Sequence, residues 1–277
     1  MTRQHPLAGL APVHTESVDR PTPFLSQIEL EYGPPEVLGR FFLRGDEAAL
    51  ARDVHLSLVT YQEFADCYRQ LAPEWPLLSI FRCEEWDAPE TDFIHLIGRN
   101  GKGQAVATQA ARLFRWSGTS LREEAQSLRL FHGRTEPLPG ARCIVTAPAA
   151  AQITGSVAYS GGGWYRPDVR RQKLSAILPR ISRALALTRW NTAYTVTFAE
   201  RPLVEKGLPK QYGYSRIEDN VLIENVIGPH FEGALSWMPV EELVVDLTAF
   251  SRDFHAQVDA IIENGSGKQN ATRVTRG

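Results

Sequence analysis

The sequence is poor in cysteine: its 277 residues include only Cys67, Cys83 and Cys143, and no two of them form a C-x-x-C pair. This spacing argues against a disulfide framework and against the usual structural zinc sites. We therefore expect buried, reduced thiols in a cytoplasmic protein. No apolar run reaches the ~20 residues that a membrane span needs, and the first residues lack the apolar core of a signal peptide.

A strong excess of one charge sign is also absent, since the formal net charge is only -2. Such a balance gives no overall attraction to nucleic acid or to a membrane surface, so neither is expected as a partner. The sequence contains no G-x-S-x-G, P-loop or H-E-x-x-H motif, and its seven histidines are dispersed. Serine hydrolases, NTPases and metalloenzymes are thus disfavoured, and no metal is expected.

The remaining composition is that of a globular protein, with 43% hydrophobic residues available for a core. Six prolines fall within residues 1–35, which predicts a Pro-rich and partly disordered N-terminal arm. Residues 36–255 are expected to form a single domain, and residues 256–277 a C-terminal tail.

Hydrophobic periodicity predicts most of the elements of that domain. Thr60, with Glu63 at capping-box spacing, predicts a helix over residues 60–71. Further helices are predicted over residues 121–131 and from Leu174 onward, the latter interrupted by Pro179. Apolar runs and turn signals predict strands over residues 54–59, 93–97, 104–116, 153–159, 194–198, 215–223 and 241–250. Residues 99–103, Arg-Asn-Gly-Lys-Gly, predict a hairpin turn between the second and third of these strands.

A glycine-rich, basic turn lies between the strand predicted over residues 153–159 and the helix that begins at Leu174. Cations at a helix N-terminus oppose the helix dipole, and a bound polyanion would offset that cost. The turn therefore predicts a phosphate or pyrophosphate site, the alternative being a solvated turn without a ligand. Four cations lie within eight positions: Arg166, Arg170, Arg171 and Lys173.

Residues 153–214 resemble the core of the GNAT acyltransferase superfamily in their order of strand, basic turn, helix, strand, short helix and glycine–aromatic junction. The family's pyrophosphate turn aligns with residues 170–175, where Lys173 and Ser175 replace two glycines. The junction corresponds to Tyr212-Gly213-Tyr214, and Pro209 stands where many members have a tyrosine.

This resemblance implies an α/β (α+β) fold with a GNAT-like mixed, mostly antiparallel central sheet flanked by helices. The implied activity is that of an acyl-CoA-dependent N-acyltransferase, which moves an acyl group to an amine of an unidentified small-molecule or peptide acceptor. The implied cofactor is acetyl-CoA or a longer acyl-CoA, bound by the turn residues Val169, Arg170, Arg171, Lys173 and Ser175.

Acyl transfer to an amine needs a base for the amine proton and an acid for the departing thiolate. The candidate acid is Tyr212, beside Gly213, and the candidate base is Glu200, at the end of a predicted strand. Asp168 and His95 are further candidate bases, although such residues are more often structural.

The run Gly161-Gly162-Gly163 follows a predicted strand and would let that strand open toward a thioester. Its alternative reading is a simple bulge or loop. Trp164 and Tyr165, next to the glycines, are candidate substrate-binding residues that could line an acyl pocket.

Other interpretations stay open. The replaced glycines and the missing tyrosine also suit a non-catalytic acyl-CoA- or ligand-binding protein on a GNAT fold. A long-chain acyl amino acid or signal synthase is a third reading, and nucleic-acid binding through Arg166–Lys173 a more distant one. The sequence leaves the acceptor, the acyl chain length and a homodimeric state undecided.

Overall fold

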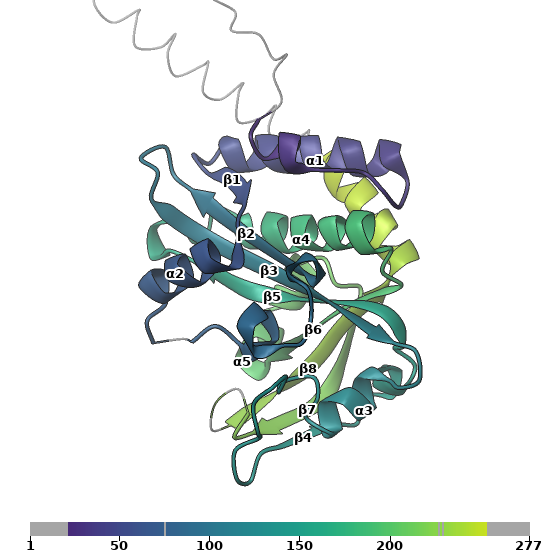
Figure 1. Ribbon diagram of the computed structural model, residues 1–277. Helices are drawn as coiled ribbons and strands as arrows, with labels where there is room; N and C mark the ends of the chain where they lie inside the picture. Colours follow the sequence, from purple (N-terminus) through teal and green to yellow (C-terminus); the bar gives the residue numbers. More distant parts are fainter. Residues whose placement is uncertain (1–21, 75, 227, 229, 254–277) are drawn as a thin grey trace, which may run out of the picture.

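The computed structural model describes residues 22–74, 76–226, 228 and 230–253, which form one central sheet with helices on both faces (Figure 1). Eight strands pair in the order β1-β2-β3-β5-β6-β8-β7-β4. All neighbours are antiparallel except β5 and β6, which confirms the predicted mixed, mostly antiparallel sheet. The strands are β1 (His55–Leu58), β2 (Phe93–Arg99), β3 (Ala105–Trp116), β4 (Arg142–Val145), β5 (Gly155–Tyr165), β6 (Tyr194–Glu200), β7 (Arg216–Glu224) and β8 (His230–Pro239).

Two hydrophobic cores lie on opposite faces of this sheet. The first joins α1, α4 and a helix over residues 240–253, and the second lies under α2 and α3. The helices are α1 (Pro35–Leu50), α2 (Tyr61–Leu71), α3 (Leu121–Gln126), α4 (Leu174–Trp190), α5 (Arg201–Glu205) and α6 (Leu208–Gln211). Short 3₁₀ segments are η1 (Leu25–Gln27), η2 (Ser79–Phe81), η3 (Cys83–Glu85), η4 (Glu90–Asp92), η5 (Pro148–Ala151) and η6 (Pro167–Val169).

Local sequence signals explain where several elements begin. Thr60 is the N-cap of α2, and its hydroxyl accepts a hydrogen bond from the Glu63 N–H at 3.3 Å. In the β2–β3 hairpin, the Asn100 side-chain oxygen accepts from the N–H groups of Lys102 and Gln104. These contacts confirm the predicted helix start and the predicted hairpin.

The strand predicted over residues 241–250 was wrong, because this segment belongs to the helix over residues 240–253. Leu243, Leu247 and Phe250 are buried at helical spacing, whereas Val245 is 68% exposed. The β-branched valines of the segment favoured a strand reading. The last strand is instead β8, which lies between β6 and β7 and is buried on both faces.

The helix predicted over residues 121–131 is shorter than expected. A capping box of Ser120 and Glu123 starts α3, but the helix ends at Gln126 and Leu128 takes a positive φ of 66°. The strand β4, which the sequence reading missed, follows and adds an edge to the sheet beside β7.

Part of the predicted N-terminal arm is docked on the domain, while residues 1–21 and the tail over residues 256–277 lie outside the described residues. Phe24 is fully buried in the core of α1 and α4, and the Thr22 hydroxyl donates to Asp46 at 2.7 Å. The Gln27 side chain bonds both the N–H and the C=O of Leu58, so it covers the outer edge of β1. The division into arm, domain and tail stays a prediction.

Candidate functional site

The parallel strands β5 and β6 separate part-way along their length. They pair only from Val157↔Tyr194 to Tyr159↔Val196. Beyond that point β5 continues beside β3, and β6 continues beside β8. The facing edges of residues 160–165 and 197–200 are therefore not joined by the sheet ladder, although the Tyr159 hydroxyl accepts from the Phe198 N–H at 3.1 Å.

The glycine run of β5 has a packing reason of its own. A Cβ on Gly161 would lie 2.9 Å from Cζ of Phe81, and Gly162 has a φ of +62°. A register shift between Thr108 and Ala110 of β3 lies opposite the run. The glycines thus leave room for the Phe81 ring and allow a β-bulge at the place where β5 and β6 diverge.

Trp164 and Tyr165 end β5, and both are half-buried. The Trp164 N–H donates to the Thr108 hydroxyl, while the Tyr165 ring packs against the core of α1 and α4. The Tyr165 hydroxyl is buried without a hydrogen-bond partner among the described residues, and burial raises its pKa well above the ordinary value. Tyr165 therefore carries an unused donor on a ring that is half-buried against this core.

The predicted anion turn lies between η6 and α4. Lys173 is the N-cap of α4 and makes no side-chain capping bond, and the first turn of α4 holds no acidic residue. Arg171 and Lys173 both have left-handed backbones, with φ of 70° and 60°. Arg170, Arg171 and Lys173 are exposed, so this end of α4 presents free main-chain donors together with cations.

The other residues of the turn have structural contacts. Arg166 forms a bidentate pair with Asp168, at 2.6 and 2.7 Å, which lowers the pKa of that carboxyl. Arg170 donates to the Tyr165 carbonyl at 2.9 Å. Val169 is buried and anchors the turn to the core, and the Ser175 hydroxyl accepts from the Gln211 side chain.

The candidate acid and base lie at the two ends of the segment that holds α5 and α6. Glu200 is exposed and precedes α5. Tyr212 follows α6 and is half-buried against the core of α1 and α4, where burial raises its pKa. Asp168 is held by Arg166, and His95 is buried with its Nε2 at 3.2 Å from the Phe81 carbonyl. Both therefore have structural partners.

Two buried arginines on α4, which the sequence reading missed, hold the segment around Tyr212. Arg180 forms a bidentate pair with Asp246, at 2.8 and 2.9 Å, and also donates to the Gln211 carbonyl. Arg183 is fully buried, donates to the Tyr212 carbonyl and lies 4.3 Å from the Tyr214 ring centroid. Arginines three residues apart in an otherwise apolar helix were the signal available in the sequence.

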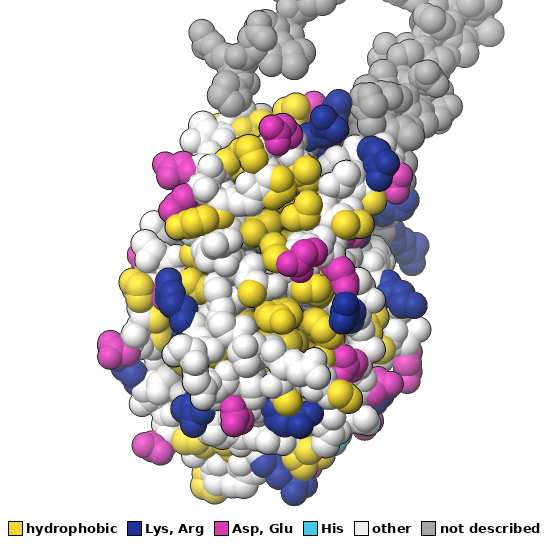
Figure 2. All heavy atoms as spheres, turned by 90° about the vertical axis from the view of Figure 1, so that its right-hand side faces the viewer, with side chains coloured by type: hydrophobic (Ala, Val, Ile, Leu, Met, Phe, Trp, Pro, Cys, Tyr) yellow, Lys and Arg dark blue, Asp and Glu magenta, His cyan; other side chains and the backbone are white. Residues whose placement is uncertain are grey.

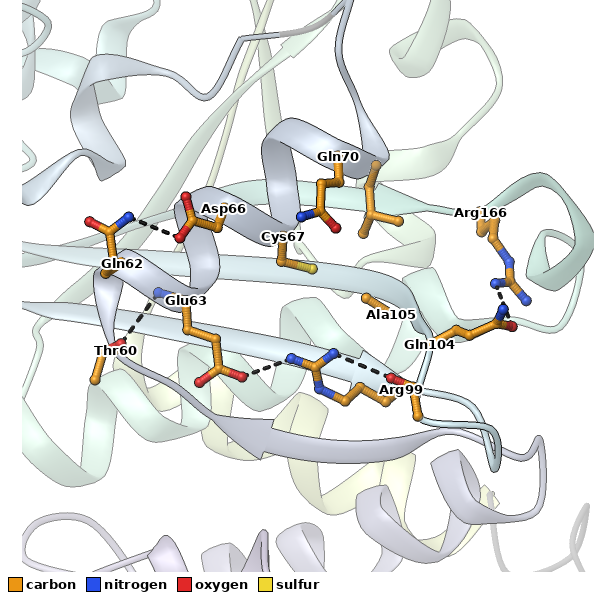
Figure 3. A pocket seen from close by; sticks show the side chains of 12 residues that line it. Thr60, Gln62, Glu63, Asp66, Cys67, Gln70, Arg99, Gln104, Ala105 and Arg166 are labelled. Carbon is orange, nitrogen blue, oxygen red and sulfur yellow. Dashed lines mark hydrogen bonds and ion pairs between the residues drawn. The ribbon is translucent and has the colours of Figure 1, made fainter.

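A cleft of about 760 Å³ opens between α2 and the β2–β3 hairpin, and Arg166 lies at its side (Figure 3). Carboxylates line the α2 wall, whereas arginines line the opposite wall. No sequence signal pointed to it, because its two walls are brought together only by the fold.

Among the described residues, no group of three or more His, Cys, Asp or Glu side chains could hold a metal ion. No described helix is both long and apolar enough to cross a membrane. On the face shown in Figure 2, side chains of both charge signs surround a central hydrophobic area.

No protein-family model and no curated protein matches the chain. Among solved structures, a putative acyl-CoA N-acyltransferase from Klebsiella pneumoniae is 13% identical, with a TM-score of 0.38 over 68% of this chain and 98% of that chain. A GNAT-family acetyltransferase from Streptococcus pneumoniae is 10% identical, with a TM-score of 0.39 over 67% and 99%. NAA60 from Arabidopsis thaliana, in complex with acetyl-CoA, is 11% identical, with a TM-score of 0.40 over 68% and 99%.

Proposed function

We propose that this chain binds an acyl-CoA and transfers its acyl group to an amine. The observation that carries the proposal is the position of the diverging strands. β5 and β6 separate after Tyr159 and Val196, and β5 leads directly into the basic turn at the uncapped start of α4. An extended thioester ligand would find unpaired main-chain groups along β5 and cations with free N–H groups at the turn.

The turn residues are assigned to the pyrophosphate. Arg170, Arg171 and Lys173 supply charge, while the main chain near Ser175 supplies N–H donors. Val169 holds the turn in place from the core. Holding thioester and amine together would supply most of the rate, since positioning alone contributes several kcal/mol, roughly 7–11 in favourable cases.

The chemical step is assigned to residues beside the diverging strands. Glu200 would take a proton from the acceptor's ammonium, so that the amine could attack the thioester carbon and form the C–N bond. As the C–S bond breaks, Tyr212 would donate its phenolic proton to the departing thiolate, and the second proton lost by the new amide nitrogen would restore the phenol. Trp164 and Tyr165 would border the acyl group. The acceptor class is an amine of a small molecule or peptide, and three free cysteines agree with a cytoplasmic location.

Acyl-CoA binding and turnover test this proposal separately. We expect CoA and acetyl-CoA to raise the melting temperature of the full-length chain, because a ligand that binds only the native state stabilises it. Free thiol released from acetyl-CoA in the presence of an amine panel measures transfer. If neither CoA species stabilises the protein in low salt, the cofactor assignment is wrong.

A second candidate is a non-catalytic acyl-CoA-binding protein on the same fold. Pro209, which stands where the resemblance expects a tyrosine, is buried, and the Tyr212 phenol is half-buried. Stabilisation by acetyl-CoA without thiol release from any amine in the panel would favour this reading. Native mass spectrometry of freshly purified protein would report the acyl chain length carried by any co-purified CoA species.

A further inference from the structure

The cleft between α2 and the β2–β3 hairpin has the form of a ligand site that the acyl-transfer proposal does not use. Its volume of about 760 Å³ lies within the range of ~300–1,000 Å³ that small-molecule sites occupy. Cys67, Leu71 and Ala105 give it an apolar lining, and the amides of Gln70 and Gln104 add donors and acceptors. Figure 3 labels Cys67, Gln70, Gln104 and Ala105 among the residues that line the cleft.

The two walls of the cleft carry opposite charges. Glu63 and Asp66 project from α2, whereas Arg99 belongs to the hairpin strand β2 and Arg166 follows β5. Glu63 and Arg99 form an ion pair at 2.7 Å that joins the two walls. Their side chains are 50% and 33% exposed, so this pair contributes little to stability and can be exchanged for other partners.

The other carboxylate of the cleft, Asp66, and its other guanidinium, Arg166, are held in their charged forms by neighbouring side chains. The Gln62 side chain donates to Asp66 and, with a smaller contribution from Arg69, lowers the pKa of that carboxyl. Asp168 raises the pKa of Arg166 through their hydrogen bonds. Asp66 and Arg166 are therefore both charged at neutral pH.

The Glu63–Arg99 ion pair determines which ligand charges the cleft accepts, because a ligand that breaks the pair has to replace both partners. A cation that takes Glu63 leaves Arg99 without its partner, and an anion that takes Arg99 leaves Glu63 without one. A molecule with both an ammonium and a carboxylate replaces the single ion pair by two and leaves no charge unpaired. Polyamines and polyanions are disfavoured because each meets like charge on one wall.

We propose that this cleft binds a small zwitterion, a free amino acid or a short peptide, with its ammonium on Glu63 and its carboxylate on Arg99. The inference concerns binding and holds whether or not the chain transfers acyl groups. It is therefore tested without any CoA present.

The test is a ¹H–¹⁵N NMR titration of the full-length chain in low salt. The probes are alanine, trialanine, N-acetyl-trialanine, which lacks the ammonium, and trialanine amide, which lacks the carboxylate. We expect trialanine at millimolar concentration to shift resonances of residues 60–71 and 99–105. The two blocked peptides should bind roughly tenfold or more weakly, because each loses one charge-assisted contact. Comparable binding of alanine would identify a free amino acid as sufficient, and binding of trialanine alone would identify a peptide.

Variants connect each ligand charge to one residue. Glu63→Gln should weaken trialanine binding by a similar factor, and N-acetylation should then cost little more, since both changes remove the same contact. Arg99→Gln should likewise weaken trialanine binding, and amidation of the peptide's carboxylate should then weaken it little further. Glu47→Gln removes a comparable surface ion pair with Arg44 on α1 and serves as the matched control, with affinity unchanged.

Two outcomes would overturn the proposal. One is the absence of shifts at both walls with alanine and trialanine. The other is binding that is equal for the blocked and free peptides, or that is equally weakened in Glu47→Gln. A thermal denaturation of each variant in buffer shows whether it is folded, so that loss of binding is not confused with loss of structure.

Discussion

Lys173 provides the sharpest test of the turn at the start of α4. It has a φ of +60°, in the left-handed region, and it is exposed. A non-glycine residue pays roughly 1–2 kcal/mol for this conformation. Glycine removes that cost but loses about 0.4–1 kcal/mol through the greater freedom of the unfolded chain. Lys173→Gly should therefore stabilise the protein by about 0.5–1 kcal/mol.

A neighbouring position serves as the control for this prediction. Arg170 lies in the same turn with φ −61° and ψ 154°, an extended backbone that any residue adopts. Arg170→Gly relieves no strain and also removes the hydrogen bond to the Tyr165 carbonyl, so it should destabilise the protein by roughly 1–2 kcal/mol. Urea unfolding at neutral pH, with equal m-values, reports both changes as shifts of the midpoint in opposite directions.

Substitutions of Lys173 can distinguish CoA binding by the main chain from CoA binding by the lysine side chain. Lys173→Ala and Lys173→Gly both remove the ammonium, which is exposed and worth at most about 1 kcal/mol. Only glycine also removes the Cβ, so the glycine variant should bind CoA more tightly than the alanine variant if N–H groups at the start of α4 meet the phosphates. The double variant Arg170→Ala/Lys173→Ala should lose about 1–2 kcal/mol of CoA binding in calorimetry at low salt.

Three results would refute this reasoning. If Lys173→Gly destabilises as much as Arg170→Gly, the left-handed backbone at Lys173 is wrong. Equal CoA affinities of the glycine and alanine variants would exclude a main-chain contact at this residue. An unchanged affinity in the double variant would remove the turn from the CoA site altogether.

Three further predictions concern the acid, the docked arm and a buried histidine. Tyr212→Phe should lower turnover by ~10²–10⁴-fold with CoA affinity unchanged, and full activity would exclude Tyr212 as the acid. Phe24→Ala should cost about 3–5 kcal/mol in thermal denaturation, whereas deletion of residues 1–20 should leave the melting temperature nearly unchanged. Burial lowers the pKa of His95 below its unfolded value, so the associated stability is present above pH ~6.5 and is lost as the pH falls. His95→Gln should therefore flatten the acid side of the stability curve, and an unchanged slope would contradict this assignment.

Elements with local signals were predictable from the sequence. The Thr60 cap, the Asn100-Gly101 hairpin and the alternation of β5 each depend on residues close together in the chain. The helix over residues 240–253 was misread because Val244 and Val245 favour a strand, while its burial is set by contacts with α1 and α4. β8 escaped notice because a strand buried on both faces does not alternate.

The turn could be proposed as a candidate site from the sequence, whereas its backbone geometry and the cleft beside α2 could not. The sequence itself shows four cations directly before a segment with helical periodicity, and these signals were sufficient to propose an anion site. The left-handed backbone of Lys173, the packing of Phe81 on Gly161 and the cleft beside α2 arise from contacts between distant segments. No local pattern encodes such contacts, and only the fold brings them together.

Ser175, at the start of α4, takes part in a set of contacts that joins this helix to the segment around Tyr212. Ser175 accepts a hydrogen bond from the Gln211 side chain at 3.0 Å, Arg180 donates to the Gln211 carbonyl, and Arg183 donates to the Tyr212 carbonyl. All three contacts come from α4, whose first residues form the proposed phosphate site. The helix thereby fixes the main chain of the proposed acid relative to the turn, so one rigid element would set the geometry of binding and of proton transfer together. A side chain at residue 175 would hinder a ligand from approaching the main chain closely. In this chain the Ser175 side chain instead helps to hold the segment around Tyr212 against α4.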